Sequence, residues 1–118
     1  MIKFLDLQKV NSLYPNELKA VAAQIIDEGW FLNGKWNEKF ADNLKEYIGC
    51  EYVIPCGNGL DALRLIFRAY KEMGIMKDGD EVIVPANTYI ATVLAITDNN
   101  LVPVFVDPDE DSYNINLE

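Results

Sequence analysis

The stretch Gly79-Asp80-Glu81-Val82-Ile83-Val84-Pro85 decides the fold class of this chain. A glycine turn leads into an apolar run rich in β-branched residues, which is typical of a strand buried on both faces. Residues 88–98 then have the length of a helix, and Val102-Pro103-Val104-Phe105-Val106 is a second strand-like run. Two such strands joined by a helix predict parallel pairing with a right-handed connection.

The same alternation extends toward the N-terminus. Tyr52-Val53-Ile54-Pro55 also has the composition of a buried strand, and Gly57-Asn58-Gly59 is typical of a turn. The helix predicted after this turn has apolar residues at helical spacing from Leu63 to Met73. Residues 51–106 therefore predict a β-α-β-α-β order, and we expect residues 51–118 to be part of an α/β domain.

Two amphipathic helices are predicted ahead of that domain. The first begins at Pro15 and ends at Gly29, while the second carries its apolar face from Trp36 onward and ends at Gly49. Residues 3–7 are expected to be extended. We therefore predict that residues 1–50 form an N-terminal helical segment.

Charge and composition exclude several classes of function. The 118 residues include 10 Lys and Arg against 19 Asp and Glu, a net charge of −9 that would repel a nucleic acid. The sequence contains no His, which excludes a His general base and most zinc sites within these residues. Its apolar runs are too short to span a membrane, and it has no recognisable secretory signal. Cys50 and Cys56 flank a predicted strand, so we expect them to be reduced thiols of a cytoplasmic protein.

Two loops of the predicted sheet could bind a ligand. The turn at residues 57–61 joins a strand to a helix, where backbone N–H groups and the helix dipole suit a phosphate. The alternative is a plain turn capped by Asn58. Tyr89 follows the next strand on the same edge of the sheet, where its ring could stack on a flat heterocycle. In the alternative, Thr88 caps a helix and Tyr89 fills the core.

Two further segments could have a function: the loop between the first two helices and the acidic run near the C-terminus. Trp30 and Phe31 could line a pocket or a subunit interface, or could pack against the main body. The acidic residues at positions 107–111 lack the spacing of a calcium loop, so we expect a solvated turn and no metal site.

Six motifs occur here in an order that resembles the N-terminal part of the DegT/DnrJ/EryC1/StrS family. Its members are sugar aminotransferases that depend on pyridoxal 5'-phosphate (PLP) and have the aspartate-aminotransferase (type I) fold. The resemblance implies that this chain is the first portion of the α/β large domain of that fold, preceded by helices. The motifs are Phe4-Leu5-Asp6-Leu7, Gly29-Trp30-Phe31, Gly57-Asn58-Gly59-Leu60-Asp61-Ala62-Leu63, Gly79-Asp80-Glu81-Val82-Ile83-Val84-Pro85, Thr88-Tyr89-Ile90-Ala91-Thr92 and Pro103-Val104-Phe105-Val106-Asp107.

The resemblance also implies roles for individual residues. The cofactor phosphate would be held by Asn58, Gly59, Leu60 and Asp61, mainly through the backbone N–H groups of Leu60 and Asp61. Tyr89 would stack on the pyridine ring of PLP.

The substrate side of the site is implied in the same way. Trp30 and Phe31 would lie near the sugar-binding cleft. They would reach that cleft from the partner subunit of a homodimer. The residue sequences of the motifs most resemble those of enzymes that transfer the amino group of glutamate to a dTDP-3-oxo-6-deoxyhexose. Amination at C4, and a PLP-dependent 3-dehydratase in which His replaces the Lys, remain alternatives within the family.

Catalytic residues are not assigned within these 118 residues. In the family pattern, the Asp that pairs with the pyridine nitrogen and the Lys that bonds to PLP both lie beyond Glu118. We therefore expect the chain alone to be inactive in transamination and to self-associate through uncovered apolar surfaces. Two alternative hypotheses belong to other functional classes. One is a Rossmann-type nucleotide-binding module, which would need a fuller glycine pattern, and the other is a non-catalytic interaction module.

Overall fold

The computed structural model describes residues 2–116. The chain divides into two compact units, Met1–Pro55 (unit 1) and Cys56–Glu118 (unit 2). Within the described part of the chain, no helix is long and apolar enough to cross a bilayer.

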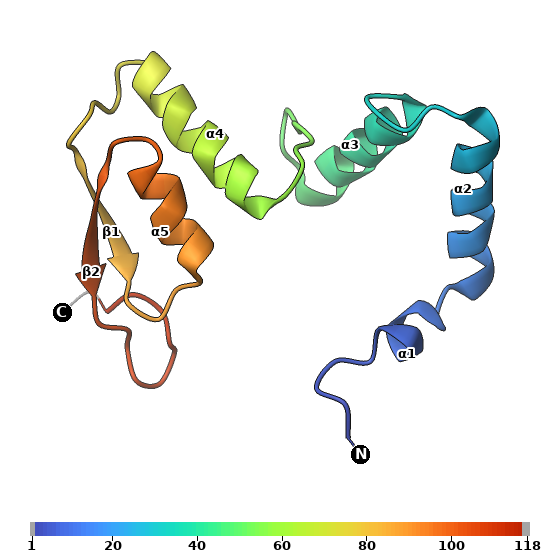
Figure 1. The fold of residues 1–118 in the computed structure, drawn as a ribbon, viewed down its shortest axis with the longest axis horizontal. Helices are drawn as coiled ribbons and strands as arrows, with labels where there is room; N and C mark the ends of the chain where they lie inside the picture. Colours follow the sequence, from blue (N-terminus) through green and yellow to red (C-terminus); the bar gives the residue numbers. More distant parts are fainter. Residues whose placement is uncertain (1, 117–118) are drawn as a thin grey trace. The chain divides into compact units, whose positions relative to one another are not determined.

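Unit 1 consists of helices α1 (Leu7–Asn11), α2 (Pro15–Glu28) and α3 (Lys35–Ile48) (Figure 1). The predicted ends of α2 and α3 are confirmed, because Gly29 and Gly49 adopt left-handed φ angles of 66° and 75° that glycine tolerates best. The extended segment predicted at residues 3–7 is wrong at its end. There the Asp6 carboxylate accepts the Lys9 N–H at 3.2 Å and starts α1 at Leu7.

Unit 2 contains α4 (Gly59–Glu72), β1 (Glu81–Pro85), α5 (Ile90–Thr97) and β2 (Val102–Val106). The strands β1 and β2 are parallel, with Ile83 opposite Val104, as predicted for two strands joined by a helix. Figure 1 shows α5 beside the two strands, where it connects the end of β1 to the start of β2.

The strand predicted at Tyr52-Val53-Ile54-Pro55 does not form. This segment is irregular, and the side chains of Tyr52 and Ile54 are 77% and 81% exposed. A strand is stable only when a neighbour completes its hydrogen-bond ladder, and among the described residues β1 pairs with β2 alone. The observed order of unit 2 is therefore α-β-α-β.

The hydrophobic core lies in unit 2. Val84 of β1, Ile96 of α5 and Leu101 form one cluster, with exposed fractions of 4% or less. The side-chain amide of Asn99 is buried beside them and donates to the carbonyl oxygens of Ala95 at 2.9 Å and Arg64 at 3.3 Å. These two bonds satisfy a buried polar group and attach α4 to α5.

Candidate functional site

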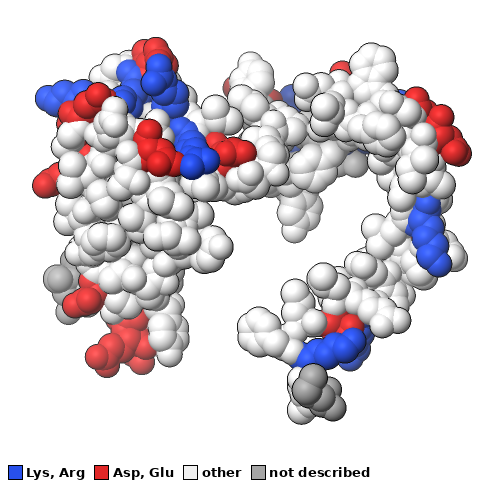
Figure 2. Space-filling model, viewed as in Figure 1, with Lys and Arg blue, Asp and Glu red and all other residues white. Residues whose placement is uncertain are grey.

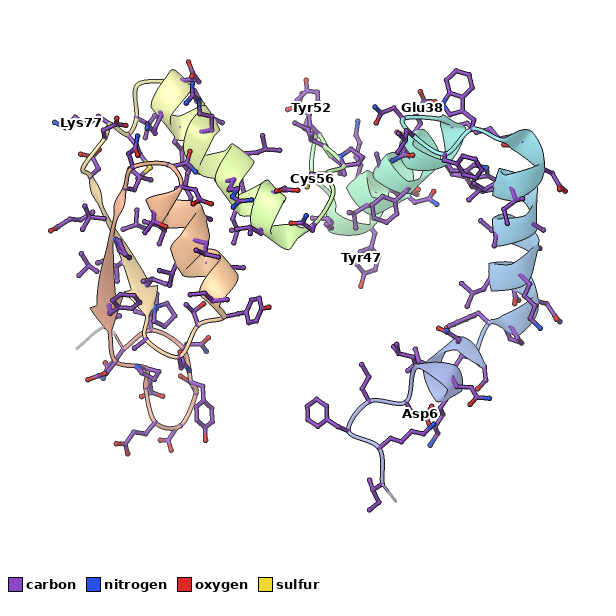
Figure 3. All side chains as sticks on the ribbon, in the orientation of Figure 1. Asp6, Glu38, Tyr47, Tyr52, Cys56 and Lys77 are labelled. Atoms are coloured by element: carbon purple, nitrogen blue, oxygen red, sulfur yellow. The ribbon has the colours of Figure 1, made fainter. Side chains whose placement is uncertain are left out.

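The turn before α4 is a capped helix N-terminus. Asn58 is extended and its side-chain Oδ1 accepts the backbone N–H of Asp61 at 2.9 Å, while its Nδ2 donates to Oδ2 of Asp61 at 2.8 Å. Cys56, labelled in Figure 3, lies in the loop just before this turn, and its Sγ donates to the carbonyl oxygen of Asn58 at 3.8 Å. The reading of Asn58 as a helix cap is confirmed.

Two backbone donors remain at this helix end. Within residues 2–116, the N–H groups of Gly59 and Leu60 have no acceptor, as is usual for the first turn of a helix. A Cβ added at Gly59 would meet no atom within 4 Å, so the space beside the turn is open. Free donors at the positive end of a helix dipole in open space fit a phosphate group. The third donor, Asp61 N–H, is already bound by Asn58.

The Asp61 carboxylate belongs to a longer network. Nη1 of Arg64 donates to Oδ1 of Asp61 at 3.3 Å, and Nε of Arg64 donates to Oδ2 of Asp98 at 2.7 Å. Nη2 of Arg64 donates to the same Asp98 oxygen. This hydrogen bonding to Asp98 raises the pKa of Arg64.

Ion pairs of this kind recur on unit 2. Figure 2 shows Lys and Arg side chains beside Asp and Glu side chains at the end of unit 2 where α4 ends. The pairs there are Arg68 with Glu72 at 2.6 Å and Lys71 with Asp78. Sequence spacing indicates an Arg64–Asp61 pair at i and i+3 on one helix. The Arg64–Asp98 contact spans 34 residues, and no local pattern signals it.

Tyr89 occupies the N-cap position of α5, directly after the loop that follows β1. Its side chain is 78% exposed, so the alternative in which it fills the core is wrong. Thr88 does not cap the helix backbone either, because its Oγ1 pairs with Oγ1 of Thr92 at 3.0 Å. The Tyr89 ring is therefore free to offer a face to a ligand.

The N-termini of α4 and α5 lie at the same end of unit 2 (Figure 1). The Arg64–Asp98 contact sets their offset. Gly59 lies about 7.5 Å along α4 before Arg64, and Ile90 lies about 12 Å along α5 before Asp98, at about 1.5 Å per residue. The turn before α4 and the Tyr89 end of α5 therefore lie at the same end of unit 2. The strand predicted ahead of that turn does not form, so the packing of α4 on α5 places the turn there.

Trp30 and Phe31 lie in unit 1, in the loop between α2 and α3, and their side chains are 68% and 63% exposed. The indole Nε1 of Trp30 donates to the carbonyl oxygen of Leu32 at 2.6 Å. A Cβ on Gly34 would lie 2.8 Å from Cδ1 of Trp30, so glycine at position 34 lets the indole approach the start of α3.

A hollow of about 440 Å³ beside Trp30 is also lined by Glu28, Lys35 and Trp36, which no sequence pattern marks as site residues. Oε1 of Glu28 accepts from Nζ of Lys35 at 2.6 Å, and Oε2 accepts from Nε1 of Trp36 at 3.2 Å. The Lys35 hydrogen bond in particular lowers the pKa of Glu28. Nζ of Lys39 lies 5.2 Å from the centre of the Trp36 ring. These contacts hold the α2–α3 corner.

The acidic run forms a tight turn. Oδ1 of Asp109 accepts the N–H groups of Ser112 at 2.8 Å and Asp111 at 3.2 Å, and the bonds from Ser112 lower the pKa of Asp109. Among the described residues, no group of His, Cys, Asp or Glu side chains is arranged to hold a metal ion.

Comparison with known proteins assigns the family. The model of the DegT/DnrJ/EryC1/StrS aminotransferase family matches residues 13–118. This chain belongs to that family. Its sequence is 46% identical over 115 residues to a dTDP-3-amino-3,6-dideoxy-alpha-D-galactopyranose transaminase of Aneurinibacillus thermoaerophilus, covering 98% of this chain and 31% of that protein. It is 37% identical over 110 residues to a dTDP-3-amino-3,4,6-trideoxy-alpha-D-glucose transaminase of Streptomyces venezuelae, covering 93% of this chain and 28% of that protein.

Solved structures of the family share the fold. A DegT/DnrJ/EryC1/StrS aminotransferase from Brucella abortus superposes with a TM-score of 0.87 at 37% identity, over 98% of this chain and 30% of that one. DesV of S. venezuelae, solved in complex with a ketimine intermediate, gives a TM-score of 0.85 at 35% identity with the same coverage. The chain therefore corresponds to the N-terminal part of a type I PLP aminotransferase and spans about a third of the length of these relatives.

Proposed function

We propose that the protein is a PLP-dependent aminotransferase acting on a nucleotide-linked keto-deoxysugar, with a dTDP-3-oxo-6-deoxyhexose as acceptor and glutamate as amino donor. The observation that carries this proposal is the 46% identity to a dTDP-3-amino sugar transaminase across 98% of the chain. The second such transaminase, at 37% identity, supports the same carbon position.

The residues of unit 2 are suited to hold the cofactor. We assign the PLP phosphate to the N-terminal turn of α4, where the N–H groups of Gly59 and Leu60 are free and Asn58 fixes the backbone. The N–H of Asp61, the other donor that the resemblance implies, is bound by the side chain of Asn58 in this structure. The exposed ring of Tyr89 offers a stacking face for the pyridine. When bound, PLP acts as the electron sink that amino-group transfer requires.

The remaining roles extend the proposal beyond unit 2. We assign Trp30 and Phe31 to the binding of the nucleotide sugar, since both are exposed in unit 1 and available to a ligand or a partner. We also propose that the active protein is a cytoplasmic homodimer, the usual assembly of this family.

A dehydratase is the second candidate. An E. coli GDP-4-keto-6-deoxy-D-mannose-3-dehydratase with bound hydrated PLP superposes with a TM-score of 0.76 at 27% identity. Its lower identity and TM-score favour the aminotransferase.

The test uses the product of the complete open reading frame that encodes residues 1–118. It is incubated with PLP, glutamate and either dTDP-3-oxo- or dTDP-4-oxo-6-deoxyhexose, and the sugars are identified by mass spectrometry and NMR. We expect a 3-amino sugar from the 3-oxo substrate. A 4-amino product would reassign the carbon, a deoxygenated sugar would establish the dehydratase, and no PLP-dependent product would overturn the proposal.

A further inference from the structure

Arg64 lies outside the proposed phosphate-binding turn but is hydrogen-bonded to a residue of that turn. Arg64 lies in α4, one turn beyond Asp61, and its guanidinium joins two carboxylates that belong to different helices. Nη1 contacts Asp61 at the start of α4, while Nε and Nη2 contact a single oxygen of Asp98, the C-cap residue of α5. The Arg64 guanidinium is thus hydrogen-bonded both to Asp61 and to Asp98.

The Asp98 end is anchored to the core of unit 2. The backbone N–H of Asp98 donates to the carbonyl oxygen of Leu94 at 2.9 Å. The next residue, Asn99, is 8% exposed and donates from its side chain to the carbonyl oxygens of Ala95 and of Arg64 itself. Both the backbone and the guanidinium of Arg64 are therefore held by the well-packed end of α5.

The Asp61 end reaches the phosphate turn. Oδ1 of Asp61 accepts from Arg64 and Oδ2 accepts from Nδ2 of Asn58, so both carboxylate oxygens are occupied. The same Asn58 amide accepts the Asp61 N–H. A continuous chain of hydrogen bonds runs from Asp98 through Arg64 and Asp61 to Asn58.

We propose that Arg64, held by Asp98, is a positioning residue that orients Asp61 and Asn58 and thereby sets the phosphate-binding turn of α4. The inference rests on the proposed function, because it takes the ligand of this turn to be the phosphate of PLP. Arg64 also offsets the Asp61 carboxylate, which would otherwise repel an anion at the same turn.

A substitution at Asp98 distinguishes a positioning role of Arg64 from a purely electrostatic one. If Arg64 acted only through long-range attraction of the phosphate, Asp98→Asn would remove a negative charge and tighten PLP binding. If Arg64 acts by position, Asp98→Asn releases the guanidinium and weakens PLP binding. The two explanations therefore predict opposite signs for one conservative substitution.

Arg68 provides a matched control. It lies on the same helix, carries the same charge, and pairs with Glu72 at i and i+4, with side chains that are 64% and 66% exposed. Arg68→Ala and Glu72→Gln thus reproduce the charge changes of Arg64→Ala and Asp98→Asn without touching Asp61.

The experiment measures dissociation constants for PLP and for pyridoxal, which lacks the phosphate, using the full open reading frame product. We expect Arg64→Ala and Asp98→Asn to weaken PLP binding by about tenfold, the loss typical of a charge-assisted hydrogen bond, and to leave pyridoxal binding unchanged. Arg64→Lys keeps the charge but cannot reproduce the contacts to both carboxylates, so it should not restore PLP binding.

The outcomes separate the two proposals. A wild-type protein that does not prefer PLP to pyridoxal refutes the phosphate assignment on which the inference rests. A wild-type protein with that preference, together with Asp98→Asn and Arg64→Lys variants that match the Glu72→Gln and Arg68→Ala controls, refutes the positioning role alone. Should Arg64→Ala fail to fold, the Asp98→Asn and Arg64→Lys results decide the question.

Discussion

Asn58 and Asp61 bind each other twice across the first turn of α4. The Asn58 amide accepts the Asp61 N–H at 2.9 Å and donates to the Asp61 carboxylate at 2.8 Å. This reciprocal pair fixes the extended backbone of Asn58 and sets the direction of the N–H groups that follow it.

Removing this cap is expected to destabilise unit 2. Asn58→Ala should lower the free energy of unfolding by about 1 kcal/mol, since Ala provides no acceptor for the Asp61 N–H. Asn58→Ser, which retains a capping oxygen, should recover most of the loss. Urea unfolding followed by circular dichroism measures the difference. Equal stability of the Ala and Ser variants would show that the cap contributes nothing.

The core around Ile96 is expected to respond strongly to truncation. Ile96 is fully buried in α5, so Ile96→Ala should cost about 2–5 kcal/mol through lost burial and the cavity left behind. Ile90 lies on the same helix but is 56% exposed, and Ile90→Ala should cost less than about 1 kcal/mol. Comparable losses in the two unfolding curves would contradict the packing seen here.

Asp78 should contribute to the acid dependence of stability. Chiefly through its hydrogen bond, Lys71 lowers the pKa of Asp78 in the folded state. The contribution is therefore complete above the unfolded pKa, about 3.9, and is lost as the pH falls through the lower folded value. Asp78→Asn should flatten the decline of the thermal midpoint below about pH 4. An unchanged acid limb would show that the pair has no influence on folding.

Gly34 should control the position of the Trp30 indole. A Cβ at position 34 would lie 2.8 Å from Cδ1 of Trp30, which is too close for both atoms to stay in place. Gly34→Ala is therefore expected to displace the indole and break its 2.6 Å bond to the Leu32 carbonyl oxygen. In a Trp36→Phe background, the Trp30 fluorescence maximum should shift. An unaltered spectrum would mean that the loop absorbs the methyl group elsewhere.

Tyr89 is expected to affect cofactor binding through its ring and not through its hydroxyl. Tyr89→Ala should weaken PLP binding by about fivefold, corresponding to about 1 kcal/mol of aromatic stacking, whereas Tyr89→Phe should bind normally. Tyr47→Ala, at an 89% exposed position of α3, serves as the control. Spectroscopic titration of the full open reading frame product with PLP provides the measurement. Normal binding by Tyr89→Ala would remove Tyr89 from the cofactor site.

The local sequence determined most of the elements and the family. Apolar spacing and glycine stops located α2, α3 and α4, and the β-branched runs located β1 and β2, because these signals depend on residues close together in the chain. The Asn58 cap was also readable, since donor and acceptor are three residues apart. The six ordered motifs identified the family because each motif is a short run of consecutive residues.

Only the tertiary structure decided which of these local preferences were realised. Tyr52-Val53-Ile54-Pro55 has strand composition but remains irregular, because a strand needs a partner and no described segment pairs with it. Tyr89 could have been a core residue or a surface residue, and packing of α5 through Ala95 and Ile96 left it exposed. The Arg64–Asp98 contact joins residues 34 positions apart, so it exists only because α4 and α5 pack against each other.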